Sequence, residues 1–282
     1  LADCYKAIHH YHKAIDVWEE YLKLDGENVT VLTRVADAYR KVQNLQRSNE
    51  LYQKVLELEP DNAYALIGLG HLYYDFRRFQ DAAHYWTRMY ELHGDRVDIR
   101  VLTSLGNCYR KLKDFDRALS YFKLALEREP DNFYALFGIA DCFRGLQRPK
   151  EALAHWNRIL MKDPGNKVIL TRAGDAYRSL GDLESAEEYY EKALSIEYDL
   201  YAVLGLALIR KAQGKFEDAS QALRDLIARD PKNPRLYGEA ARCLLEMGEP
   251  DSAMEILKEA KTNNVRNRRL AELEQELRSQ LQ

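Results

Sequence analysis

A pattern that returns every 34 residues constrains the fold of this chain more than any other feature of its sequence. Full copies open at Val29, Ala63, Ile99, Phe133, Lys167, Leu200 and Pro234. Similarity at such a period is typical of an array of small structural units, each packed against its neighbours. The sequence therefore predicts a repeat protein.

Side-chain size within the repeat predicts two helices. Position 8 is always Ala or Gly and position 20 is Ala or Ser, whereas position 24 is large. Small residues let two helix backbones approach closely, and a ring at position 24 fills the space beside them. Positions 4, 7, 8 and 11 share one face of a helix, as do positions 20, 24 and 27 of a second. Position 32 is proline in four repeats, which ends the second helix.

The spacing predicts seven full repeats between two shorter ends. The full repeats are 29–62, 63–96, 99–132, 133–166, 167–199, 200–233 and 234–267. Residues 1–28 form a truncated repeat without its first positions, so we expect further chain upstream. Residues 268–282 carry an apolar stripe of Leu270, Leu273, Leu277 and Leu281 on a polar segment. That composition is typical of a helix that caps an array.

These positions resemble those of the tetratricopeptide repeat family over residues 1–267. The resemblance implies an all-α fold, a right-handed superhelical solenoid of antiparallel helix pairs, and protein or peptide binding without catalysis. Arg210 and Leu244 depart from the family by replacing an aromatic residue at position 11. The family's clamp for acidic chaperone tails is absent: in its nearest approach Asn107 matches, but Thr103 and Gly138 stand where the family has Lys and Asn.

Alternate repeats are more similar to each other than to their neighbours. Tyr64, Tyr134 and Tyr201 open the same short apolar segment in every second repeat, which indicates a double unit of 68 residues. Either function or duplication history explains it.

Positions 2, 5, 9 and 12 of the first helix in each repeat lie on the face opposite the buried one. We call this face the inner stripe. The resemblance implies that this stripe lines a concave groove where ligands bind. It holds nine basic and four acidic residues in a chain of formal charge −3. The candidate binding residues are Asp37, Arg40, Tyr64, Arg100, Asn107, Arg110, Tyr134, Phe137, Asp141, Arg144, Asp175, Arg178, Tyr201 and Lys211.

Two interpretations of these charges are open. Each aspartate at position 9 could pair with the arginine at position 12 of its own or a neighbouring helix, which would only hydrate the surface. Alternatively, the arginines and tyrosines bind an extended partner with acidic groups, because guanidinium groups hold carboxylates in bidentate fashion.

No catalytic motif is present. Gly68 and Gly70 lie inside a predicted helix rather than in a phosphate-binding loop. His9, His10 and His12 cluster at a turn, where solvation is favoured over a metal site. We expect no metal, cofactor or small-molecule substrate.

The cysteines indicate a reducing compartment. Cys4, Cys108, Cys142 and Cys243 all occupy position 10, and neighbouring first helices are too far apart for disulfides. They are expected to be small buried hydrophobic residues with free thiols. A cytoplasmic location is favoured, and a periplasmic one stays open because the N-terminus is missing. No apolar run is long enough for membrane insertion.

Three functions compete. The chain is a scaffold or adaptor for a partner protein, or a substrate-docking arm of a larger enzyme or of a secretion or assembly machine, or a nucleic-acid binder. The acidic balance and the aspartates of the inner stripe disfavour nucleic acid. Self-association through the uncapped N-terminal end is a further expectation.

Overall fold

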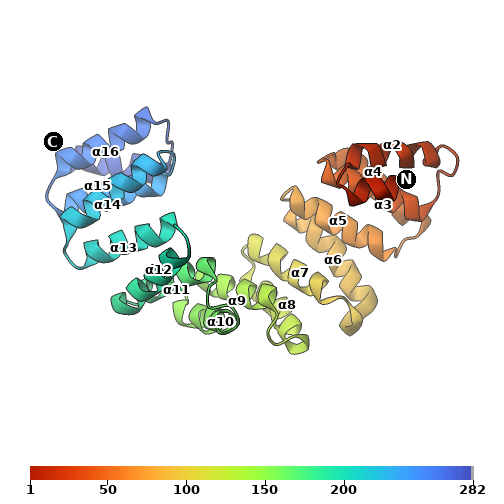
Figure 1. Cartoon of the computed structure of the whole chain (residues 1–282), viewed down its shortest axis with the longest axis horizontal. Coiled ribbons are helices and arrows are strands. Elements are labelled where there is room, and N and C mark those ends of the chain that lie inside the picture. Colours follow the sequence, from red (N-terminus) through yellow and green to blue (C-terminus); the bar gives the residue numbers. More distant parts are fainter. Residues whose placement is uncertain (281–282) are drawn as a thin grey trace. The chain divides into compact units, whose positions relative to one another are not determined.

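The computed structural model describes residues 1–280, and all regular structure in that range is helical (Figure 1). The chain divides into two compact units, one from Leu1 to Arg148 and the other from Pro149 onward. The division falls inside the predicted repeat 133–166.

Helices of the N-terminal unit follow one another as antiparallel pairs. Their bounds are α1 (Ala2–Ala7), α2 (Tyr11–Leu22), α3 (Val29–Lys41), α4 (Leu45–Leu58), α5 (Ala63–Asp75), α6 (Phe79–His93), a 3-10 turn (Gly94–Arg96), α7 (Ile99–Lys111), α8 (Phe115–Arg128) and α9 (Phe133–Gly145). Each helix packs against the next along the chain, and α3 also contacts α5 as α7 contacts α9. The first helices therefore lie along one side of a stack.

The C-terminal unit repeats this arrangement. Its helices are α10 (Pro149–Lys162), α11 (Lys167–Ser179), α12 (Leu183–Ile196), α13 (Leu200–Ala212), α14 (Phe216–Arg229), α15 (Pro234–Glu246), α16 (Pro250–Thr262) and α17 (Arg268–Gln280). The final helix, α17, packs on α15 and α16. Leu270 and Leu277 of α17 are buried, whereas Leu281 lies outside the described residues.

An asparagine or aspartate fixes where each first helix begins from α3 onward. Asn132 shows the geometry, because its side-chain oxygen accepts the backbone N–H of Ala135 at the start of α9. The same cap precedes α3, α5, α7, α11, α13 and α15. Capping satisfies backbone donors that the helix itself leaves open. These caps set which side chains point into the core and which into the inner stripe.

Core packing follows the predicted alternation of size. The rings at position 24 are buried, and Phe122 of α8 contacts the glycines of two successive first helices, Gly106 of α7 and Gly138 of α9. Tyr190 of α12 lies in the same way against Gly174 and Gly205. One large residue therefore holds a helix pair to the next repeat, which is the expected architecture of stacked helix pairs.

Val97 and Asp98, the two residues between the repeats 63–96 and 99–132, are part of the fold. Val97 is buried and its carbonyl oxygen accepts a hydrogen bond from the guanidinium of Arg128, while Asp98 caps α7. This pair therefore ties the end of α6 to α8.

Candidate binding groove

A hollow of about 630 Å³ opens on the inner stripe of the N-terminal unit. Gly68 of α5 and the ring of Tyr52 belong to its lining, with Tyr64, Ile67 and His71 of α5 on one side. The side facing them includes Lys6 of α1 and Thr30, Thr33, Arg34, Asp37 and Arg40 of α3. A space of this size accommodates a few side chains of a peptide.

Charged side chains beside this hollow are bonded to each other. Asp37 receives Lys6 Nζ at 3.1 Å and Arg40 Nη2 at 2.9 Å, and Arg40 Nη1 reaches Asp75 at 2.6 Å. Burial raises the pKa of Asp37, but the bonds from Arg40 and Lys6 outweigh it and hold that pKa below its ordinary value. Burial of the His71 ring, together with the charge of Arg40, lowers the pKa of that imidazole. His71 is therefore neutral at pH 7 and offers one donor and one acceptor.

A second charged group links α7 with α9. Arg110 donates to Asp141 at 2.8 Å and to Asn107 at 3.0 Å, and Arg144 donates to the other oxygen of Asp141 at 3.1 Å. The Asp141 side chain is only 4% exposed. Two guanidinium groups therefore share one buried carboxylate.

The C-terminal unit pairs several of its inner-stripe charges as well. Tyr190 donates its hydroxyl to Asp175 at 2.8 Å, and Arg178 lies 3.6 Å from the same carboxylate. Burial beside Asp175 raises the pKa of Tyr190. Lys211 bonds Glu246 at 2.8 Å.

These contacts fit the first interpretation of the charges, pairing of position 9 with position 12. The pairing also crosses between repeats, as Arg110 and Asp141 show. Arg110 is only 16% exposed, and reversing its charge would place two carboxylates against each other. Arg100 and Arg144 differ, since their side chains are 86% and 57% exposed while bonded to Asp98 and Asp141.

Aromatic residues at position 2 of alternate repeats are exposed on the inner stripe. Tyr64, Tyr134 and Tyr201 are 79%, 66% and 52% exposed. Phe137 is half-buried, with its ring stacked on Phe133 at 5.9 Å between centroids. Large rings exposed at a recurring position are available for contact with a ligand.

Three of the four cysteines are buried, and Cys4 is exposed. The prediction that all four are buried is wrong for Cys4, because no first helix of the described chain covers that side of α1. Burial raises the pKa of the Cys108 and Cys142 thiols to about 12. Between residues 1 and 280, no group of three or more His, Cys, Asp and Glu side chains has a geometry that could hold a metal ion.

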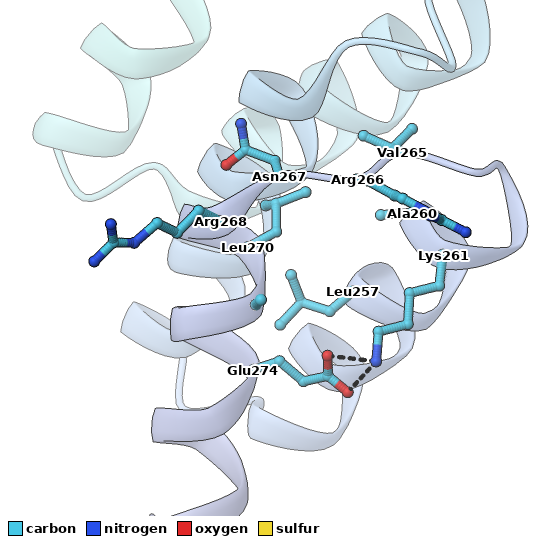
Figure 2. Close-up of a pocket in the computed structure, with 10 residues that line it drawn as sticks. Leu257, Ala260, Lys261, Val265, Arg266, Asn267, Arg268, Leu270 and Glu274 are labelled. Atoms are coloured by element: carbon cyan, nitrogen blue, oxygen red, sulfur yellow. Dashed lines mark hydrogen bonds and ion pairs between the residues drawn. The ribbon is translucent and has the colours of Figure 1, made fainter.

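A cleft of about 450 Å³ separates α16 from α17 (Figure 2). Leu257, Ala260, Val265 and Leu270 give it an apolar lining. Lys261 reaches across to Glu274 at 2.7 Å, as Figure 2 shows, and Arg278 bonds the same carboxylate at 2.8 Å. These bonds hold the pKa of Glu274 below its ordinary value.

No described helix is both long and apolar enough to cross a membrane.

Solved structures with the same architecture are numerous. YrrB, described as a TPR protein with an unusual peptide-binding site, is 24% identical over 66% of this chain and 95% of its own, with a TM-score of 0.55. A tetratricopeptide repeat protein from Parabacteroides merdae is 16% identical over 86% and 96% of the two chains, with a TM-score of 0.66. PilW, a type IV pilus biogenesis factor, is 19% identical over 74% and 96%, with a TM-score of 0.63. At these identities the likeness concerns the fold alone.

Sequence models give the family. No curated protein matches the chain. Models of the tetratricopeptide repeat match residues 33–96, 99–132, 134–166, 169–200 and 211–277. Together these segments cover most of the chain and follow the helix pairs of the structure, so this protein belongs to the tetratricopeptide repeat family.

Proposed function

We propose that this chain is a scaffold that binds a segment of a partner protein on its inner stripe. The exposed rings of Tyr64, Tyr134 and Tyr201 carry the proposal. Tyrosine supplies a large contact area, a polar hydroxyl and little side-chain entropy to lose, which is why it is frequent where proteins bind each other. The fold itself does not require these rings to be aromatic.

The bonded charges have a different part in the same function. Bonds within the chain engage Asp37, Arg40, Arg110, Asp141, Asp175, Arg178 and Lys211. The bonds of Asp37, Arg40, Arg110 and Lys211 cross between first helices and hold them in register, whereas Asp175 and Arg178 pair within α11. Arg100 and Arg144, which extend into solvent, are the side chains that would meet acidic groups of the partner. Asn107, whose side-chain oxygen already accepts from Arg110, would add an amide donor, and Phe137 would add an apolar edge.

A peptide-display selection tests this proposal. Peptides from a random library are selected on the whole chain, and their affinities for purified variants are measured by calorimetry. Replacing Tyr64 and Tyr134 by serine should weaken the selected peptides by at least about tenfold, because truncating interface aromatics commonly costs more than 1.4 kcal/mol. Circular dichroism should show an intact fold in the variant.

Met161→Ser is the matched control, because Met161 is 74% exposed near the end of a second helix, α10. This change should leave affinity within about twofold. Equal binding by wild type and by the tyrosine double variant would refute the inner stripe as the site, as would loss of binding in the Met161 variant alone.

A further inference from the structure

A second hollow lies where the first turns of α15 and α17 meet. It has a volume of about 210 Å³. Its lining, which we call the arginine pocket, is Pro234, Arg235, Gly238, Glu239, Arg242, Asn267, Arg269, Leu270 and Leu273. A space this small suits one functional group of a larger ligand. The pocket lies wholly within the C-terminal unit.

Positive charge in this pocket is not balanced within the chain. Three guanidinium groups line it against the single carboxylate of Glu239, and only Arg242 bonds that carboxylate, at 3.5 Å. Within residues 1–280, the side chains of Arg235 and Arg269 have no hydrogen-bond or ion-pair partner, in contrast to Arg40 and Arg110 of the N-terminal unit. Arg235 occupies position 2 of its repeat, as Tyr64 does in another, and Arg269 is the second residue of α17.

The backbone adds to this field. Asn233 and Asn267 accept the backbone N–H groups of Arg235 and Arg269, so both helices begin beside the pocket. Each helix has 13 residues, and the positive ends of two helix dipoles favour an anion there. The floor has an apolar part, since Gly238, Leu270 and Leu273 line it. A bound anion would therefore be partly shielded from water, which strengthens its bonds to the arginines.

We propose that the arginine pocket binds an oxyanion group, a carboxylate or a phosphoryl group, presented by a peptide. Arg235 and Arg269 would hold its oxygens from two sides, and Arg242 would bond it in exchange for its long contact with Glu239. Guanidinium groups suit both kinds of oxyanion because their N–H donors form a planar fork. This inference depends on the proposed function in one respect: the bound peptide would supply the oxyanion.

The experiment measures fluorescence anisotropy with three labelled probes on the whole chain. The probes are hexaglutamate, a peptide with two phosphoserines, and uncharged hexaglutamine. We expect at least one anionic probe to bind while hexaglutamine does not. Replacing Arg235 and Arg269 together by glutamine should weaken that probe by at least about tenfold, which removal of two charge-assisted hydrogen bonds readily gives. Comparison of the two anionic probes identifies the source of the oxyanion.

Arg224→Gln with Arg268→Gln is the matched control. This control also removes two positive charges, one from α14 and one from the residue next to Arg269 in α17. Neither residue lines the pocket. The control should change affinity by less than about twofold. An equal loss in this control would show attraction by net charge alone and overturn the site, as would failure of both anionic probes to bind wild type.

A second variant tests the space rather than the charge. Gly238 leaves room for a side chain, because an added Cβ would have Leu270 Cδ2 as its nearest neighbour at 3.5 Å. Gly238→Gln should weaken binding of the anionic probe by about tenfold while all arginines remain, and unchanged affinity would contradict burial of the oxyanion in this pocket.

If the arginine variants bind the anionic probe as wild type does while the tyrosine variants lose the selected peptides, the oxyanion site is refuted and the proposed function stands. The reverse result would leave the oxyanion site and refute the tyrosines of the inner stripe as contacts of the partner.

Discussion

At the scale of single residues, the ring at position 24 limits the size of the side chains that face it from the first helices. A Cβ atom on Gly138 would lie 2.2 Å from Phe122 Cζ, inside the ring's own volume. Phe122 is fully buried between two first helices, so it has no free direction in which to move. Glycine is required here by packing rather than by backbone conformation.

Gly138→Ala should therefore destabilise the protein by about 1–3 kcal/mol, although alanine is the better helix former. Urea unfolding followed by circular dichroism measures the change. The control is Gly165→Ala, where the nearest atom to the new Cβ would be Asp163 Oδ1 at 3.9 Å, and its effect should stay within about 0.5 kcal/mol. Equal stability of wild type and the Gly138 variant would show that the repeats can move apart.

The thiols should fall into two classes. Cys4 is exposed, whereas Cys108, Cys142 and Cys243 are buried and burial raises the pKa of each. Because the thiolate is the reactive form, one thiol should react quickly with a disulfide reagent at pH 8 and three slowly. All four should react after denaturation without reductant. Fast reaction of a second native thiol would contradict the burial of position 10.

The Asp37 carboxylate should stabilise the fold in a pH-dependent way. Its folded pKa lies below the ordinary value of 3.8, so its contribution is present above that pH and is lost as the pH falls through the lower folded value. Asp37→Asn should cost about 1–3 kcal/mol at pH 7, and the difference from wild type should shrink below about pH 3.8. Thermal unfolding over a pH series measures it. Exposed Asp16→Asn should cost less than about 0.5 kcal/mol throughout.

At the scale of helices, the sequence was enough to predict the pairs but not their contacts. Period and side-chain size predicted the stacked antiparallel helices because these properties depend on neighbours close in the chain. An asparagine or aspartate before each first helix from α3 onward recurs in the sequence, and this local signal is enough to place the helix starts. The bond from Arg110 to Asp141 was harder to foresee, because it depends on how far one first helix shifts along the next. Arg269 was missed because residues 268–282 were interpreted only as a cap.

The caps offer a prediction at this scale. Asn132 accepts from the backbone of α9 and donates to Glu129 at 2.8 Å, so it joins the end of one repeat to the start of the next. Asn132→Ala should destabilise the protein by about 0.5–2 kcal/mol, as loss of a helix cap usually does. Asn132→Ser should retain most of that stability because its hydroxyl also accepts from the helix. Urea unfolding that finds serine as costly as alanine would contradict a capping role.

At the scale of the whole molecule, nearest-neighbour packing determines how stability is distributed. In a repeat array each pair is stabilised by its own core and by the pairs beside it, so inner pairs gain from two sides. Within the N-terminal unit, α7 is packed between α6, α8 and α9, whereas α1 has only six residues and leaves Cys4 and Ile8 exposed. The unit should therefore open from α1 and α2 before it opens at α7 and α8.

Hydrogen exchange followed by mass spectrometry should show this order. Amides of α1 and α2 should exchange at least about tenfold faster than those of α7 and α8, because opening the end exposes less apolar surface than opening the middle. Self-association through the N-terminal end, which remains a prediction, has its own signature in the same experiment. Protection of α1 and α2 should then rise with protein concentration while that of α7 and α8 stays constant, since binding stabilises only the segment that it covers. Identical exchange of both segments at every concentration would contradict end-first opening and self-association together.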